Sequence, residues 1–359
     1  LRIQGRWAEV SYDTALTRAA ELLTAARRPL FVGLTCLGSW AQAAALKLAR
    51  RLRARLEPAD LPLLAPYYQS VREFGLFTAT LEVIRDQADT VVFWGANPLH
   101  SCPRQVVRYA VFARGRFRER GVEDRRVAVV DLLPTEPKEF AHLFIKTDPT
   151  RELKLVEEVV ETVASPGGQV SASARKLAEF LQQAEYGVIF VGRGVTYGAT
   201  EALWAALVRL TAELNRDRPF IILPLATDFN SCGWYQLALR ELGHPWAPDF
   251  GLGEETYAVA PGGLEEVDAV LVAGGDPFWF RSEAEVSALQ RRQVPVVVLS
   301  PFANRSSGYA EVILPAAAAG LEAPEVAYRL DGLPFYLSGV LPSENWSDLQ
   351  ILERLTAML

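Results

Sequence analysis

Short apolar runs alternate with longer amphipathic segments along this 359-residue chain, and this alternation restricts its possible folds more than any other feature. Runs rich in Val, Ile and Phe are typical of buried strands, and amphipathic segments between them are typical of crossover helices. Seven runs are expected to be strands: residues 30–33, 90–95, 127–131, 187–191, 220–224, 269–273 and 294–299. The sequence therefore predicts the α/β class, with parallel sheets in a multi-lobed body.

Composition argues against several other kinds of protein. Half of the residues are hydrophobic, which is enough for a large core, and no run approaches the ~18 apolar residues of a membrane span. The first residues lack the apolar core of a signal peptide, so we expect a globular cytoplasmic protein. A net charge of -6 argues against nucleic acid as the main partner. Cys36, Cys102 and Cys232 lie far apart, so neither a disulfide framework nor an iron–sulfur or zinc site is predicted.

Two lobes are expected, at residues 1–164 and 165–359. The candidate linker is the Ser-, Pro- and Gly-containing segment 164–169, although the same residues could cap the helix before it. The segment 228–266 is rich in Gly, Pro and aromatic residues and lacks a regular period. We expect it to be a long, packed loop region, and the chain to end in a C-terminal extension.

Glycine or a polar side chain follows several predicted strands. Ligands of open α/β sheets bind outside the carboxyl ends of the strands, so these positions are candidates for a binding groove. The candidates are Asn97, Asp131, Gly192, Thr196 and Asp276. Two alternatives stay open, because a tight turn needs glycine for steric reasons and aspartate is a good helix N-cap.

A stretch after the second predicted strand is rich in arginine. It contains Arg104, Arg108, Arg114, Arg116, Arg118, Arg120, Arg125 and Arg126. Arginine prefers bidentate carboxylate and phosphate partners. The stretch is interpreted as a solvated helix face, as a cradle for phosphate or polyglutamate, or as a contact with an acidic neighbouring subunit.

The residue patterns of familiar catalytic sites are absent from the sequence. The histidines are His100, His142 and His244, and none has a second histidine at the spacing of metal ligands. Neither a G-x-S-x-G elbow nor a P-loop is present. Cys102 follows His100 closely, but neighbouring loop residues rarely face each other, which favours a packed thiol over a nucleophile.

Several longer motifs resemble those of a known protein family, which the spacing of single residues does not reveal. Residues 88–104, ADTVVFWGANPLHSCPR, resemble the B subunit of formylmethanofuran dehydrogenases. The resemblance continues in order through GRGVTYG at 192–198, DFN at 228–230, AEVILP at 310–315 and AYRLDGLP at 327–334. It implies the α/β body of molybdopterin oxidoreductases, with the strand ends lining a groove for a bis-pterin guanine dinucleotide.

The chain departs from that family at the positions that the resemblance assigns to catalysis. An active member has an amino-terminal iron–sulfur domain, and this sequence begins after the expected end of that domain. The family's Cys-His-Gly-Pro motif, whose cysteine or selenocysteine binds molybdenum or tungsten, corresponds here to residues 63–66, with Leu63 at the ligand position. The expected active-site arginine is replaced within residues 224–227. The resemblance thus implies no catalytic residue, no metal and only a vestigial groove in this chain.

Such a degenerate chain resembles the B subunit of the formyltransferase/hydrolase complex of methylotrophic bacteria. The resemblance implies a structural role beside the A, C and D subunits, with a methanofuran-like carrier and metal ions bound by those partners. In that complex a formyl group passes from formyl-tetrahydromethanopterin to the carrier and is hydrolysed to formate during formaldehyde oxidation.

Two other interpretations stay open. The first is a working pterin-binding oxidoreductase subunit with a metal ligand other than cysteine, and with its iron–sulfur domain on another polypeptide. The second is a free-standing enzyme whose groove holds another nucleotide. The structural role, by contrast, predicts large exposed apolar surfaces and poor behaviour of the isolated chain.

Overall fold

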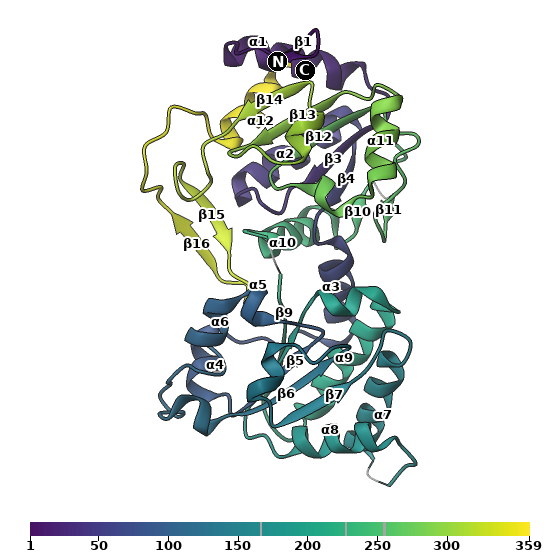
Figure 1. The fold of residues 1–359 in the computed structure, drawn as a ribbon, viewed down its shortest axis with the longest axis vertical. Helices are drawn as coiled ribbons and strands as arrows, with labels where there is room; N and C mark the ends of the chain where they lie inside the picture. Colours follow the sequence, from purple (N-terminus) through teal and green to yellow (C-terminus); the bar gives the residue numbers. More distant parts are fainter. Residues whose placement is uncertain (166, 227, 254–255) are drawn as a thin grey trace. The chain divides into compact units, whose positions relative to one another are not determined.

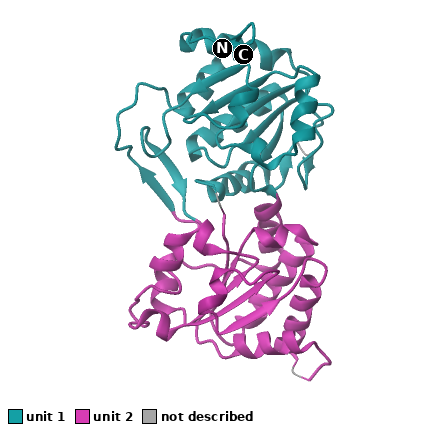
Figure 2. Cartoon of the chain, in the orientation of Figure 1, with its two compact units in different colours: residues 1–61, 228–329, 334–359 teal, residues 62–227, 330–333 magenta. Residues whose placement is uncertain are grey.

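The computed structural model describes residues 1–165, 167–226, 228–253 and 256–359 (Figure 1). These residues form two compact units, which Figure 2 shows in different colours. Unit 1 contains residues 1–61, 228–329 and 334–359, and unit 2 contains residues 62–227 and 330–333. Unit 2 is therefore inserted into unit 1, and the chain passes between the units four times.

Unit 2 is built on a parallel sheet of five strands in the order β7-β6-β5-β8-β9. The strands are β5 (Thr90–Trp94), β6 (Arg126–Asp131), β7 (Leu143–Lys146), β8 (Gly187–Val191) and β9 (Phe220–Pro224). All residues of β5 and β8 are buried. Alternate side chains such as Val91, Phe93, Val188 and Phe190 enter one core, as the two-residue period of a strand requires.

The helices of unit 2 follow the amphipathic segments of the sequence. They are α3 (Leu61–Phe74, which begins at the last residue of unit 1), α4 (Leu81–Gln87), α5 (Pro98–Ser101), α6 (Pro103–Arg108), α7 (Glu152–Ala164), α8 (Ala172–Gln182) and α9 (Thr200–Leu214). Thr80 and Ser171 cap α4 and α8, because each hydroxyl accepts a hydrogen bond from a free backbone N–H. Asp331 also binds the start of α4, where its carboxylate accepts a hydrogen bond from Leu81 N at 2.8 Å.

Unit 1 is built on a second parallel sheet of five strands, in the order β14-β13-β12-β3-β4. The strands are β3 (Pro29–Gly33), β4 (Arg55–Pro58), β12 (Ala269–Ala273), β13 (Val296–Ser300) and β14 (Val312–Pro315). The helices are α1 (Tyr12–Ala25), α2 (Ser39–Leu52), α10 (Ser231–Leu242), α11 (Glu283–Arg291) and α12 (Asp348–Met358). Ser282 and Ser347 begin α11 and α12 with capping boxes.

Three antiparallel pairs complete unit 1. They are β1 (Arg2–Ile3) with β2 (Arg6–Trp7), β10 (Ala247–Pro248) with β11 (Tyr257–Ala258), and β15 (Glu325–Tyr328) with β16 (Pro334–Leu337). The last pair is a hairpin whose connecting residues, 330–333, belong to unit 2. Among the described residues, no helix has both the length and the apolar character needed to cross a bilayer.

The α/β class with parallel sheets is confirmed, and each of the seven expected strands forms. The expected boundary between residues 164 and 165 does not separate the two units, because β8 and β9 lie beside β5 in the sheet that also holds β6. Ser165 is instead the C-cap of α7, and Pro166 in the candidate linker lies outside the described residues. The segment 228–266 is not wholly a loop region, since it contains α10 as well as β10 and β11.

Candidate functional site

Each sheet has one point where the direction of strand addition reverses. In unit 2 the strands β6 and β7 follow β5 on one side of it, and the next strand, β8, pairs with the other side of β5. In unit 1 the chain builds β3 and β4 and then places β12 on the other side of β3. These are the two common orders of doubly wound sheets, in which ligands bind at the reversal, outside the carboxyl ends of the strands.

Glycines fill both reversal points. A Cβ atom on Gly194 would lie 2.7 Å from Gly95 Cα, and one on Gly192 would lie 2.6 Å from the Ala96 Cβ. In unit 1 a Cβ atom on Gly33, whose φ is +95°, would lie 2.3 Å from Gly274 O. The turns after neighbouring strands thus pack directly on each other. This close packing is a sufficient reason for Gly192 to be glycine without any ligand.

A cavity of about 190 Å³ opens at the reversal point of unit 2. It is lined by Gly95, Asp131, Leu132, Leu133, Thr135, Thr147, Asp148, Pro149, Glu152, Gly194 and Tyr197. Asp131 ends β6, and its Oδ1 accepts a hydrogen bond from the next backbone N–H, that of Leu132, at 2.7 Å. Asp131 is therefore the one predicted groove residue that lines this cavity.

Glu152 gives the cavity its unusual chemistry. It lies in the first turn of α7, and the indole N–H of Trp94 at the end of β5 donates a hydrogen bond to its carboxylate. Burial raises the pKa of Glu152 to about 7; the Trp94 hydrogen bond opposes this rise, whereas the neighbouring carboxylates of Asp131 and Asp148 add to it. The carboxyl group therefore gains and loses its proton near neutral pH.

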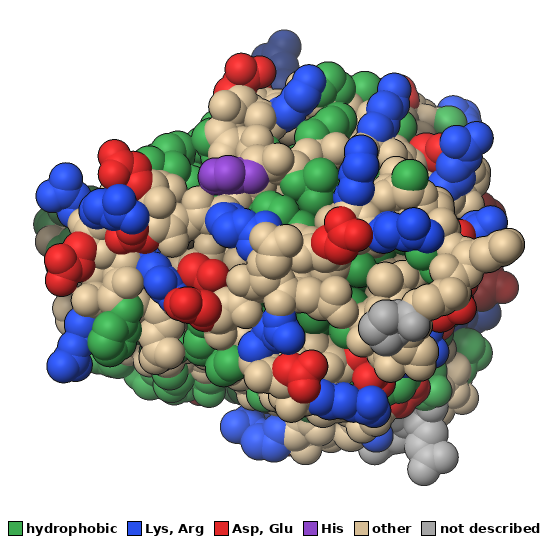
Figure 3. Space-filling model, turned by 90° about the horizontal axis from the view of Figure 1, so that it is seen from below, with side chains coloured by type: hydrophobic (Ala, Val, Ile, Leu, Met, Phe, Trp, Pro, Cys, Tyr) green, Lys and Arg blue, Asp and Glu red, His purple; other side chains and the backbone are tan. Residues whose placement is uncertain are grey.

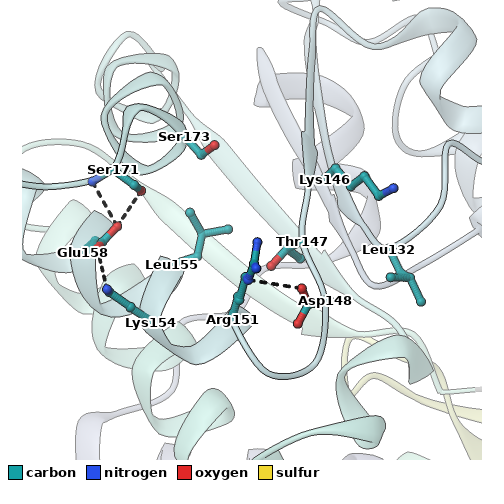
Figure 4. Close-up of a pocket in the computed structure, with 10 residues that line it drawn as sticks. All are labelled: Leu132, Lys146, Thr147, Asp148, Arg151, Lys154, Leu155, Glu158, Ser171 and Ser173. Carbon is teal, nitrogen blue, oxygen red and sulfur yellow. Dashed lines mark hydrogen bonds and ion pairs between the residues drawn. The ribbon is translucent and has the colours of Figure 1, made fainter.

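A second cavity, of about 680 Å³, adjoins the first and shares Leu132, Thr147 and Asp148 with it (Figure 4). Its cations come from the end of β7 and the start of α7: Lys146, Arg151 and Lys154. Arg151 lies 3.6 Å from Asp148, and Lys154 lies 3.8 Å from Glu158, which also accepts hydrogen bonds from Ser171. Among the described residues, Lys146 has no acidic partner.

The other predicted groove residues have their own hydrogen-bond partners. In unit 2, Asn97 Nδ2 donates to Glu136 Oε2 at 2.7 Å, and Thr196 Oγ1 donates to Arg193 O at 2.8 Å. Asp276 lies in unit 1, where it accepts hydrogen bonds from the backbone N–H groups of residues 305 and 306 and so joins the turns after β12 and β13. The predicted groove residues thus belong to both units, and those in unit 2 do not all line the same cavity.

The pair His100 and Cys102 does not form a nucleophile and base. His100 Nε2 lies 3.0 Å from Glu136 Oε1. Burial raises the pKa of the Cys102 thiol, so that a reactive thiolate is disfavoured. The interpretation of Cys102 as a packed thiol agrees with this geometry.

The arginine stretch divides into two groups. Arg118 and Arg120 form ion pairs with Glu185 and Asp124, Arg125 is buried and donates to three backbone carbonyls, and Arg126 stacks on Phe180. Among the described residues, no acidic partner meets the exposed side chains of Arg104, Arg108 and Arg114, and Arg116 lies over Phe117. The face of unit 2 seen in Figure 3 interleaves basic, acidic and hydrophobic side chains.

The motif at residues 228–230 has a structural role within unit 1. Asn230 is completely buried, and its Nδ2 donates to Leu37 O at 3.1 Å and also reaches Ser39 and Gln42. Its Oδ1 accepts a hydrogen bond from Tyr328 N at 2.7 Å. One side chain thus joins the turn after β3, the helix α2 and the strand β15.

Leu63, the residue at the position that the resemblance assigns to the metal ligand, lies in α3 and is completely buried. Its side chain has no donor atom for a metal. Burial raises the pKa of the Cys36 thiol to about 12, so that a thiolate is strongly disfavoured there at neutral pH. Within the described ranges, no group of three or more His, Cys, Asp or Glu residues is arranged to hold a metal ion.

Two doubly wound parallel sheets with glycine-filled reversal points place the chain in a class of α/β proteins whose sheets commonly bind nucleotide cofactors. The family model of molybdopterin oxidoreductases matches residues 1–334. The B subunit of the tungsten-containing formylmethanofuran dehydrogenase 2 of Methanocaldococcus jannaschii is 30% identical, over 96% of this chain and 82% of the relative. The same subunit of Methanococcus maripaludis is 28% identical, over 97% and 83%.

Solved structures show the same fold. A chain of the formyltransferase/hydrolase complex from Methylorubrum extorquens, solved with methylofuran, matches with a TM-score of 0.76 at 20% identity, over 98% of this chain and 97% of that one. Acetylene hydratase from Pelobacter acetylenicus matches with a TM-score of 0.62 at 13% identity, over 99% of this chain and 60% of that one. This chain belongs to the molybdopterin oxidoreductase family and, within it, to the B subunits of formylmethanofuran dehydrogenases.

The residues of this chain fit the pterin dinucleotide cofactor of that family poorly. A thiolate is the ligand type that soft metal sites select, and Leu63 offers none. The cavity at the reversal point of unit 2 has three carboxyl groups, and none of its described lining residues is Lys or Arg. Carboxylates repel the phosphates of a dinucleotide, and among these three groups only Asp148 has a cationic partner in the described residues, Arg151 at 3.6 Å in the adjoining cavity.

Proposed function

We propose that this chain is a non-catalytic structural subunit of a cytoplasmic formyltransferase/hydrolase complex in one-carbon metabolism. The main observation behind this proposal is Leu63, which is buried in α3. A leucine side chain cannot replace a cysteine or selenocysteine as a metal ligand. The match over nearly the whole length of a chain from such a complex supports it.

The partners in this proposal are the A, C and D subunits, which would carry out formyl transfer and metal-dependent hydrolysis. The formyl group would travel from formyl-tetrahydromethanopterin to a methanofuran-like carrier and leave as formate. This chain would bind no cofactor of its own. A large α/β body that fixes the distance between two active sites raises the effective concentration of a carrier that swings between them.

One observation favours a second candidate, an active tungsten- or molybdenum-pterin subunit. The curated relatives are tungsten-containing enzymes, and the chain is more similar to them in sequence, at 28–30% identity, than to the chain of the bacterial complex, at 20%. In that case a ligand other than cysteine would complete the metal site.

Purification of the complex through a tag on this chain separates the two candidates. We expect the A, C and D subunits to co-purify, formate to form from formyl-tetrahydromethanopterin, and elemental and pterin analysis to find no tungsten, molybdenum or pterin. A tungsten-containing formylmethanofuran dehydrogenase, purified and analysed in parallel, is the positive control. One metal with pterin per copy of this chain, together with formylmethanofuran oxidation, would refute the structural role and establish the second candidate.

A further inference from the structure

A groove of about 700 Å³ runs between the packed helices α2 and α12 of unit 1. From α2 it is lined at positions 40, 43, 44, 47 and 51, and from α12 at positions 349, 353, 356 and 357. Both sets follow the helical period of three and four residues, so each helix presents one continuous stripe. From Trp40 to Arg51 the stripe on α2 is about 16 Å long, which matches about three turns of a helix laid along it.

The floor of the groove is apolar and is made mostly of small side chains. Ala43 and Ala44 of α2 and Ala357 of α12 allow the backbone of another element to approach closely, and Leu349 lies on α12 as well. Trp40 stands at one end with 43% of its surface exposed, and its ring lies 6.2 Å from the ring of Tyr336, which is 64% exposed. Exposed aromatic side chains beside an apolar groove are typical anchors of protein interfaces.

Positive charge follows the apolar floor along α2. Lys47 and Arg51 are both exposed, and among the described residues neither has an acidic partner. Glu353 lies across the groove on α12 and forms no ion pair with them within 4.0 Å. An occupant that is apolar at one end and carries carboxylates near Lys47 and Arg51 would complement both features.

A second copy of this chain is a poor source of such an occupant. The acidic helix α7 carries exposed Glu157, but its apolar residues Leu155, Val156 and Val159 are already buried in unit 2. The helix α7 of a second copy therefore cannot supply the apolar face that the groove requires, and an acidic amphipathic helix of a partner subunit fits both features better. We propose that the groove between α2 and α12 is the docking site for an amphipathic helix of a partner subunit, whose carboxylates bind Lys47 and Arg51. The inference rests on the proposed role as a subunit of a complex.

Charge reversal within the intact complex tests the docking site. We expect the double variant Lys47→Glu and Arg51→Glu to raise the dissociation constant of the complex at least about tenfold, because attraction becomes repulsion at two positions. The matched control is Lys176→Glu with Arg209→Glu, two exposed residues of α8 and α9 in unit 2 with no ion pair among the described residues. The control should change the constant by less than about twofold.

Photo-crosslinking identifies the occupant and does not require the charge variants to fold. A photoreactive amino acid in place of Ala44 should crosslink to an acidic amphipathic helix of a partner subunit. A crosslink to a second copy of this chain, a crosslink to a non-acidic segment, or an intact complex without any crosslink would overturn the docking site. Equal dissociation constants for the groove variant and the wild type would do so as well. These results leave the proposed function standing, whereas a wild-type chain that purifies without partners contradicts the proposed function itself.

Discussion

Replacing Glu152 by glutamine should stabilise unit 2, and more so at alkaline than at acidic pH. Burial raises the pKa of Glu152 from 4.5 to about 7, so the folded state holds the neutral form. The stability that this proton provides is complete below pH 4.5 and is lost as the pH rises through 7. At pH 8 the loss is about 3 kcal/mol as an upper value, and at pH 5 it is about 1 kcal/mol.

Glutamine avoids this loss because its amide stays neutral and its oxygen still accepts the hydrogen bond of the Trp94 indole. The free energy of unfolding of Glu152→Gln should thus exceed that of the wild type by about 2 kcal/mol more at pH 8 than at pH 5. Hydrogen exchange of peptides from β5 and α7 in increasing urea measures this quantity for unit 2 alone. Each exchange rate has to be corrected for the intrinsic rate at that pH.

The matched control is Glu157→Gln, the same change at an exposed position on the same helix. It should alter the free energy of unfolding by less than about 0.5 kcal/mol at either pH. Two results would contradict a buried, neutral Glu152 in the folded state. One is the same stability difference between Glu152→Gln and the wild type at both pH values, and the other is a less stable variant at pH 8.

Three further predictions, one with a matched control substitution, test hydrogen bonds and packing in both units, each by chemical unfolding. Asn230→Ala should cost about 3–5 kcal/mol because it leaves several buried backbone and side-chain groups of unit 1 without partners, whereas Asn97→Ala at an exposed hydrogen bond should cost less than about 1 kcal/mol. Gly194→Ala places a methyl group 2.7 Å from Gly95 Cα and should cost about 1–3 kcal/mol; an equal stability would show that the turn can shift freely. Arg125→Lys should cost at least about 2 kcal/mol, since lysine lacks the planar fork that reaches three carbonyls, and a neutral result would contradict that role.

The fold was predictable where local sequence decides the structure. The strands β5, β8 and β13 are apolar along almost their whole length because both of their faces are buried. The strands β7 and β14 have only four residues each and include partly exposed positions, so their runs were too short to stand out. The division into units was not predictable from composition, because it depends on which distant strands pair.

The candidate site was predictable only in part, for a similar reason. The position of Asp131 at a strand end was enough to place it at a cavity, since parallel strands bring their carboxyl ends to one edge of the sheet. The burial of Glu152 could not be predicted from the sequence, because Glu152 is one of several glutamates in an amphipathic helix. It became evident from the structure, in which Glu152 is buried and contacts Trp94. Asn230 belonged to a noticed motif, but its role depends on partners that are distant in the sequence, 98 residues away at Tyr328 and 193 residues away at Leu37.

The insertion of unit 2 into unit 1 sets an order of folding during protein synthesis. The strands β3 and β4 are made first, but their sheet needs β12, which begins at residue 269, about 210 residues after β4 ends. At about 5–20 residues per second, roughly 10–40 s pass between the synthesis of β4 and that of β12. All five strands of unit 2 are made within that interval, so unit 2 can form its sheet while unit 1 is still incomplete. During this interval the half-made unit 1 presents β3 with one unpaired edge, and open strand edges favour aggregation.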